Sequence, residues 1–283
     1  MNSILITGAG SGIGAAVAMK LSKREGIRVL LVGRRLDALE EVRKTMHRPE
    51  AHVSLPVDVS DAHAVVSALE SSAADLSNQP LTGVFANAGI GGGNQWGPDD
   101  RWEDIIRVNL TGTYNTLMAS FSHLKLADGV KQILVTSSVL ARFGVPGQSA
   151  YVTSKTGLLG LVRSLAVEWS PQGVMVNALC PGWVDTDMAR NSIQSMADAQ
   201  GMSFEKCKGQ QESILPCLRM TTPAEMAQWV DFLFTGLGEG EGVPRLATFT
   251  GQALDVNSGS WICLLYTSDA ADDTPCVDLG GRR

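Results

Sequence analysis

Three kinds of feature are scarce in this chain of 283 residues, and each absence excludes a class of protein. No apolar stretch approaches the roughly 20 residues of a membrane-spanning helix, so we expect no membrane partner. No basic run with interleaved aromatics is present, and the net charge of -6 argues against a general nucleic-acid binder. The first apolar run begins almost at Met1 and leaves no space for a signal peptide, so we expect a cytoplasmic protein.

Cysteine and histidine are too few and too scattered to predict a disulfide framework or a metal site. The five cysteines include no CxxC pair, and His47, His52, His63 and His123 stand in no spacing typical of metal ligands. We therefore expect no metal. The hydrophobic content of 44% and the charged content of 18% are typical of a globular protein, and the length suits one α/β domain with a sizeable core.

Short apolar runs alternate with amphipathic stretches, which predicts a parallel sheet with crossover helices. Strands are expected around residues 4–6, 29–32, 84–86, 133–135, 174–176 and 253–256. Long helices are expected over 109–124 and 148–170. Thr222 followed by Pro223 and Glu225 predicts a capped helix that continues to Phe234.

Tyr151 and Lys155 predict acid–base chemistry, because they stand at positions i and i+4 of an expected helix. A helix of about 3.6 residues per turn puts such positions on one face, so the phenol and the ammonium can point into the same space. A free tyrosine has a pKa of about 10, and a neighbouring cation lowers it by favouring the phenolate. The pair alone is also typical of a solvated helix face, so the interpretation depends on further motifs.

Three further motifs share this chain in a specific order and spacing. Residues 7–14 read TGAGSGIG after the first expected strand, residues 87–89 read NAG after another, and Ser137 and Ser138 end a third. Together with the Tyr–Lys pair they resemble the short-chain dehydrogenase/reductase family over residues 3–259. The resemblance implies a Rossmann-type doubly wound parallel α/β sheet in a single domain, which we expect to span residues 1–262.

The resemblance also implies the catalytic roles. Ser138 stands thirteen residues before Tyr151, as in the family, and would hydrogen-bond the substrate oxygen. Ser137, one residue out of register, is the alternative. Tyr151 would donate the proton in reduction, Lys155 would lower the pKa of the tyrosine and bind the nicotinamide ribose, and Asn109 would hold a water that links Lys155 to solvent.

A dinucleotide site is expected where small residues let the backbone approach a pyrophosphate at a helix N-terminus. Ala86 stands where the family's NNAG motif has its first asparagine. The PG motif of residues 181–182 precedes residues that would hold the nicotinamide carboxamide. The expected cofactor-binding residues, besides Tyr151 and Lys155, are Gly8, Ser11, Gly12, Ile13, Gly14, Arg34, Arg35, Asp58, Val59, Asn87, Ala88, Gly89, Pro181, Gly182, Val184 and Thr186.

The end of the second expected strand favours NADP(H) over NAD(H). NAD specificity usually needs a carboxylate there to accept hydrogen bonds from the ribose, but this chain has Arg34 and Arg35, and the first acid, Asp37, is expected inside the next helix. Arginine pairs with a 2′-phosphate through charge-assisted hydrogen bonds. Ser11, which stands where many NADP-dependent members carry a basic residue, keeps NAD(H) open as the alternative.

Residues 177–186 and 251–256 resemble the 3-oxoacyl-thioester and polyketide ketoreductases of the family most. We therefore expect a small-molecule carbonyl substrate, and 3-oxoacyl thioesters are one candidate. The alternatives are an NAD-dependent secondary-alcohol dehydrogenase similar to the hydroxysteroid enzymes, and an inactive dinucleotide-binding regulator. The resemblance further implies a homotetramer. The candidate pocket residues are Trp96, Leu140, Phe143, Trp183 and Met188.

The last 21 residues, 263–283, resemble the translation of a transposase-based sequencing adapter. We interpret them as an artefactual, disordered tail and exclude them from the fold.

Overall fold

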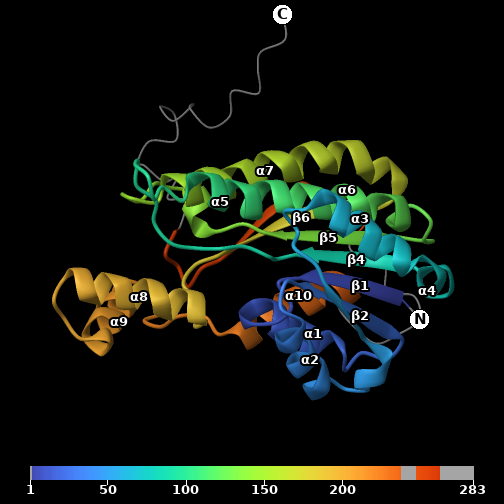
Figure 1. The fold of residues 1–283 in the computed structure, drawn as a ribbon, viewed down its shortest axis with the longest axis horizontal. Coiled ribbons are helices and arrows are strands. Elements are labelled where there is room, and N and C mark those ends of the chain that lie inside the picture. Colours follow the sequence, from blue (N-terminus) through green and yellow to red (C-terminus); the bar gives the residue numbers. More distant parts are fainter. Residues whose placement is uncertain (1, 237–246, 262–283) are drawn as a thin grey trace, which may run out of the picture.

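A seven-stranded parallel sheet in the order β3-β2-β1-β4-β5-β6-β7 forms the centre of the computed structural model, which describes residues 2–236 and 247–261 (Figure 1). The expected tail and most of the glycine-rich segment after residue 236 lie outside the described residues. The strands are β1 Asn2–Thr7, β2 Ile27–Gly33, β3 Val53–Pro56, β4 Leu81–Ala86, β5 Lys131–Thr136, β6 Val174–Pro181 and β7 Ala253–Val256.

Helices cover both faces of the sheet, and Figure 1 shows the two layers. Helices α3, α6 and α7 pack on one face through a large apolar cluster, and α1, α2 and α10 pack on the other through a second cluster. The helices are α1 Gly12–Leu21, α2 Leu36–Thr45, α3 Ala62–Ser71, α4 Ala73–Asn78, α5 Trp102–Ile106, α6 Gly112–Leu124, α7 Ser149–Trp169, α8 Asp187–Ala199, α9 Phe204–Ser213 and α10 Pro223–Thr235. The Rossmann-type doubly wound fold is therefore confirmed.

The six expected apolar runs all lie in strands. The first five have the continuous apolar sequence of a strand covered on both faces, whereas β7 contains Asp255 and is only partly buried. Strand β3, which is not among those six runs, ends at Pro56, and Asp58 and Val59 lie in the segment that follows it. The capped helix is confirmed: Thr222 and Glu225 form a reciprocal capping box at the start of α10.

The helix expected over 109–124 differs from the prediction in one respect. It begins earlier, as α5, and passes through a π-helical segment, η2 Arg107–Thr111, before it continues as α6. Such one-turn π segments are frequently found at functional sites, and Asn109 lies at the middle of this one.

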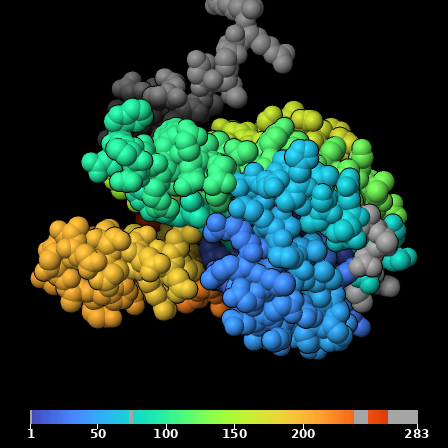
Figure 2. Space-filling view, viewed as in Figure 1, coloured from blue at the N-terminus to red at the C-terminus, as the bar shows by residue number. Residues whose placement is uncertain are grey.

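Helices α8 and α9 extend away from the sheet as a small lobe beyond the carboxyl ends of the strands (Figure 1). The lobe has its own apolar cluster, whose fully buried members are Ile193, Ala197 and Cys207. Figure 2 shows a hollow where this lobe faces the segment that follows β4. In the described part of the chain, no helix is long and apolar enough to cross a membrane.

Candidate active site

Helix α7 brings Tyr151 and Lys155 together at the carboxyl edge of the sheet, as their spacing predicts. The Lys155 ammonium nitrogen lies 5.6 Å from the centre of the Tyr151 ring. It donates a hydrogen bond of 2.8 Å to the carbonyl oxygen of Thr136, the last residue of β5. The Lys155 side chain is therefore held by the sheet and not by solvent, since the residue is only 4% exposed.

Burial shifts the pKa values of this pair in opposite directions. It lowers the pKa of Lys155 from 10.5 to about 8, because the charged ammonium loses hydration. Burial also raises the pKa of the Tyr151 phenol, against the opposing effect of a hydrogen bond with Ser138. This direction is opposite to the lowering expected from Lys155, because loss of hydration penalises the phenolate more than the surrounding groups stabilise it.

The two candidate serines have different surroundings. Ser137 is buried, and its hydroxyl donates a hydrogen bond of 2.8 Å to the backbone carbonyl of Lys155, so it fastens α7 to β5. Ser138 caps the short 3-10 helix η3 Val139–Ala141 and lies within hydrogen-bonding reach of the Tyr151 phenol. The geometry thus assigns a structural contact to Ser137 and leaves Ser138 beside Tyr151.

Asn109 is fully buried and is bonded on both of its side-chain atoms. Its Oδ1 accepts from the backbone N–H of Ile90 at 2.8 Å, and its Nδ2 donates to the Ile90 carbonyl and to the Ser154 hydroxyl. Ser154 in turn donates to the carbonyl of Tyr151 at 2.8 Å. The side chain of Asn109 therefore joins the segment after β4 to the turn of α7 that carries Tyr151.

The glycine run after β1 forms a close backbone approach that larger residues would block. Gly8 and Gly12 have φ of 67° and 54°, a region that favours glycine. A Cβ on Gly14 would collide with the carbonyl oxygen of Gly8, and one on Gly8 would lie 3.0 Å from the backbone of Ala88. Ser11 precedes the first turn of α1 without a side-chain cap, so the amides there face the carboxyl edge. This cradle fits a dinucleotide pyrophosphate.

Asn87 and its neighbours fasten the glycine loop to the middle of the sheet. The Thr7 hydroxyl accepts from the backbone N–H groups of Asn87 and Ala88, at 2.9 and 3.0 Å. The Asn87 side chain donates to the Thr7 carbonyl and accepts from the Thr136 hydroxyl at 3.1 Å. Gly89 lies where a Cβ would meet Asn109 and Lys155. The motifs after β1, β4 and β5 therefore share one network.

The end of β2 presents Arg34 and Arg35 to solvent, and Asp37 lies in α2 as expected. Neither arginine forms an ion pair with another residue of the described chain. Burial by itself raises the pKa of Asp58 and is the largest single effect. Hydrogen bonds from Ser60 and the positive charges of Arg34 and Arg107 together outweigh it, so the pKa is lowered. Arg34 and Asp58 therefore lie close to each other, with Val59 buried next to them.

The segment after β6 lies over the glycine loop. A Cβ placed on Gly12 would lie 3.2 Å from the Thr186 methyl. The Thr186 hydroxyl donates to the Val184 carbonyl and caps α8. Gly182, after Pro181, passes so close to Asn257 that a Cβ would be 2.8 Å from its carbonyl. The expected cofactor-binding residues at the ends of β1, β2, β4 and β6 therefore lie at one edge of the sheet. Ile13 lies in the first turn of α1.

The expected pocket residues do not form one group. Trp96 is 95% exposed, and Trp183 packs with the apolar cluster of the lobe. A Cβ placed on Gly91 would lie 3.1 Å from the Met188 side chain, and Phe143 is exposed. Met188 is therefore the member placed between the lobe and the segment after β4.

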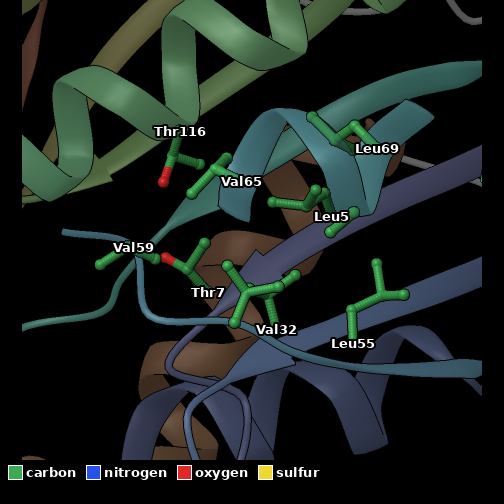
Figure 3. A pocket seen from close by; sticks show the side chains of 10 residues that line it. Leu5, Thr7, Val32, Leu55, Val59, Val65, Leu69 and Thr116 are labelled. Carbon is green, nitrogen blue, oxygen red and sulfur yellow. The ribbon is translucent and has the colours of Figure 1, made fainter. Parts of the chain in front are cut away.

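Two cavities of the described chain do not include the Tyr151–Lys155 pair, although the first borders the site through Thr7 and Val59. The one in Figure 3, about 10 Å³, is apolar except for two threonines and has space for no more than a water. Its lining includes Leu5, Thr7, Val32, Leu55, Val59, Val65, Leu69 and Thr116. A second cavity, about 270 Å³, lies between the start of α10 and the end of β7. Neither has Tyr151 or Lys155 in its lining.

Sequence reasoning missed the residues that hold the reactive groups. Thr136 and Ser154 supply hydrogen bonds described above, yet no motif singles them out, and Thr7 opens the glycine motif without any role having been expected for its side chain. Each is a hydroxyl or carbonyl at a strand end or helix turn, a signal too common to find them without the fold.

Comparison with known proteins places this geometry in a family. A model of the short chain dehydrogenases matches residues 2–197. The 3-oxoacyl-(acyl-carrier-protein) reductase FabG of Pseudomonas aeruginosa is 32% identical over 261 residues, which cover 91% of this chain and 96% of that protein. The chain therefore belongs to the short-chain dehydrogenase family, and it is an NAD(P)-dependent oxidoreductase.

Solved structures agree over almost the whole chain. An actinorhodin polyketide ketoreductase with NADPH superposes with a TM-score of 0.80 at 30% identity, covering 92% of this chain and 97% of its own. Carveol dehydrogenase from Mycobacterium avium in complex with NAD superposes with a TM-score of 0.81 at 26% identity, covering the same shares. A nicotinamide dinucleotide is therefore the cofactor type of this fold.

Proposed function

We propose that this protein reduces a carbonyl compound with NADPH, and oxidises the corresponding alcohol in reverse, through Asn109, Ser138, Tyr151 and Lys155. The observation that carries the proposal is that Tyr151 and Lys155 share a space with Ser138 at the edge where the glycine cradle opens. When bound, the nicotinamide would supply the hydride. The protein would supply the proton and the electrostatic environment.

The roles that we propose for the side chains are those that the family resemblance implies. Ser138 would donate a hydrogen bond to the substrate oxygen and stabilise the charge that develops there. The Tyr151 phenol would donate its proton to the same oxygen in reduction; its raised pKa keeps it protonated and therefore able to do so. Lys155, with a pKa of about 8, would then return a proton to the phenolate. Asn109 would hold the water that connects Lys155 to solvent.

The cofactor preference that we propose, NADP(H) over NAD(H), rests on the end of β2. Arg34 and Arg35 are exposed there, and no carboxylate occupies residues 33–35. A guanidinium would pair with the 2′-phosphate, which NAD lacks. The NAD-bound carveol dehydrogenase favours the second candidate, an NAD-dependent secondary-alcohol dehydrogenase.

We propose a 3-oxoacyl thioester as the substrate class. The similarity to FabG and to a polyketide ketoreductase supports this choice. A panel of 3-oxoacyl thioesters, simple ketones, ring ketones and hydroxysteroids, each with NADPH and NADH, tests it by the absorbance of the reduced cofactor. We expect the highest kcat/KM for a thioester with NADPH. Higher kcat/KM for a ring alcohol with NAD would support the dehydrogenase instead.

The remaining alternative is an inactive regulator that binds the dinucleotide. It would bind NADPH, as measured by fluorescence, and turn over no member of the panel. The presence of Asn109, Ser138, Tyr151 and Lys155 speaks against it, because a regulator has no need of a proton donor.

We also propose a cytoplasmic homotetramer. The free thiols Cys180, Cys207 and Cys217 suit a reducing compartment. The outer side of α7 exposes Val167, which is 81% accessible, and the neighbouring α6 exposes Tyr114, so both helices offer apolar surface to another copy. Light scattering on a chain ending at Ile262 tests the assembly, and a monomer would refute it. The same measurement on the full chain shows whether residues 263–283 hinder assembly.

A further inference from the structure

Asn94, in the segment after β4, lies outside every motif of the family resemblance yet contacts the first turn of the helix that carries Tyr151. Its Oδ1 accepts from the backbone N–H of Ala150 at 2.8 Å and from the Ser149 hydroxyl at 3.1 Å. Its own backbone N–H donates to the Gly147 carbonyl at 2.9 Å. The residue that precedes α7, Gln148, gives no side-chain cap. Asn94 therefore caps α7 from a distant segment of the chain.

The other end of the Asn94 amide reaches a second helix. Its Nδ2 donates to Oδ1 of Asp100 at 3.2 Å, and the same oxygen accepts from the backbone N–H of Trp102, the first residue of α5. Helix α5 continues directly into η2, where Asn109 lies. One side chain thus connects the starts of the two helices that carry Asn109 and Tyr151.

These two helices are connected again one layer deeper. Asn109 binds both backbone groups of Ile90 and the hydroxyl of Ser154, and Ser154 binds the carbonyl of Tyr151. The segment from Ile90 to Asn94 is therefore fixed at both ends, to Asn109 at one and to α7 at the other. The hydrogen bonds close a ring that has Tyr151 as a member.

The Ala150 amide makes this contact costly to lose. Ala150 is fully buried, so without Asn94 its N–H loses its protein acceptor. The start of α7 would rotate or fray to expose the amide, and Tyr151 is the next residue. Displacements of about 1 Å at a reacting group can lower a rate by about 100-fold.

We propose that Asn94 is a positioning residue for Tyr151, which it holds in register with Asn109 by bonding the starts of α7 and α5 together. The inference rests on the proposed function, because it assigns Asn94 to the proton-donating helix. The glycine cradle and Arg34 have no contact with Asn94 among the bonds of the described chain, so cofactor binding is independent of it.

The first test is Asn94→Ala, assayed on the substrate that the wild-type protein turns over best. We expect kcat to fall by about 10- to 100-fold, while KM for NADPH stays within about twofold. A kcat equal to that of the wild type would overturn the proposal.

The second test exchanges the partners. Asn94→Asp keeps the acceptor for Ala150 but puts its carboxylate against that of Asp100, and Asp100→Asn restores a donor facing it. The double variant rebuilds the bond between residues 94 and 100 with donor and acceptor reversed and keeps the cap of α7, but the amide nitrogen at position 100 cannot accept from the Trp102 N–H. Because the contact with the helix that carries Tyr151 is retained, we expect kcat to return to within about threefold of wild type. If the double variant folds and kcat stays as low as in Asn94→Ala, the bonds do not position Tyr151.

Thr222→Ala is the matched control, because it removes the cap of α10, which carries none of the proposed catalytic groups. It should lower the melting temperature and leave kcat unchanged below it. If Thr222→Ala lost as much kcat as Asn94→Ala, the effect of Asn94 would be explained by general stability and the positioning role would be refuted.

Hydrogen exchange of a peptide covering residues 149–155 separates the two proposals. Exchange there should accelerate in Asn94→Ala, return to normal in the double variant and stay normal in Thr222→Ala. If the wild type reduces no carbonyl, the proposed function fails, and exchange alone decides whether Asn94 holds α7. Unchanged exchange in Asn94→Ala would refute that hold whatever the activity.

Discussion

The α8–α9 lobe lies beyond the carboxyl edge of the sheet (Figure 1), but the two regions are built in opposite ways. At the edge, Asn109 is fully buried, Lys155 is 4% exposed, and each is bonded to backbone groups of another element. In the lobe, four buried residues form the cluster between two short helices, and Met188 is 44% exposed.

The difference in hydrogen bonding and burial between the edge and the lobe indicates which region needs to be rigid. Proton donation depends on distances of a fraction of an ångström, and bonds between strand ends and helix turns fix such distances. A lobe with few buried apolar contacts opens at a lower free energy than the sheet, which suits a segment that must admit a substrate. This contrast supports the proposal that the edge carries the chemistry and the lobe controls access of the substrate.

The largest effect is expected at the edge, from Tyr151→Phe. The substitution removes the proton donor and leaves the ring in place, so kcat should fall by about 10²- to 10⁴-fold while NADPH binding is retained. Steady-state kinetics and a fluorescence titration of NADPH measure the two quantities. Turnover close to that of the wild type would remove Tyr151 from the mechanism.

A smaller effect is expected where the edge is exposed, at Arg34. Arg34→Asp removes the proposed phosphate partner and adds a ribose acceptor, so the ratio of kcat/KM for NADPH to that for NADH should fall by about 100-fold, which corresponds to about 3 kcal/mol. Arg163→Asp is the matched control, because Arg163 is an exposed arginine on α7. Arg24 is less suitable, because it pairs with Asp231. A wild-type protein that already prefers NADH would contradict the role of Arg34.

Lys155 makes the stability of the edge depend on pH in the alkaline range. Its pKa in the folded chain, about 8, lies below the ordinary 10.5, so the fold binds fewer protons than the unfolded chain between these values. Stability must then rise with pH across this window, and the cost of the buried ammonium is fully present below pH of about 8. The free energy of unfolding of the wild type minus that of Lys155→Met should increase by about 3 kcal/mol between pH 7.5 and pH 10.5.

Denaturant unfolding of both proteins at matched pH values measures this difference, because the pH dependence of groups distant from Lys155 cancels, and the same pair of measurements in a Tyr151→Phe background removes the contribution of Tyr151. A difference that is constant over the window would show that Lys155 keeps an ordinary pKa.

The smallest effect on turnover is expected from the lobe. Ile193→Ala leaves a cavity in a cluster of few residues, so the lobe should loosen and KM for the substrate should rise by about 3- to 10-fold with kcat nearly unchanged. Ile4→Ala is the matched control in the sheet core: it should lower the melting temperature and leave KM unchanged. Equal effects of the two variants on KM would abolish the distinction between edge and lobe.

The sequence determined the order of elements and the local geometry, because both depend on short-range periodicity. Apolar runs define six strands, a capping box starts α10, and the spacing of Tyr151 and Lys155 puts both on one turn of α7. The glycine spacing likewise predicts a tight turn after β1, since only residues without a Cβ fit there.

Only the tertiary structure decided which groups meet across the chain. It separates Ser137 from Ser138, raises the pKa of Tyr151, and puts Asn94 at the start of a helix 56 positions away in the sequence. Such contacts depend on the register of strands and helices packed on one sheet, and on the burial that this packing produces. Neither register nor burial is a property of a short stretch of sequence.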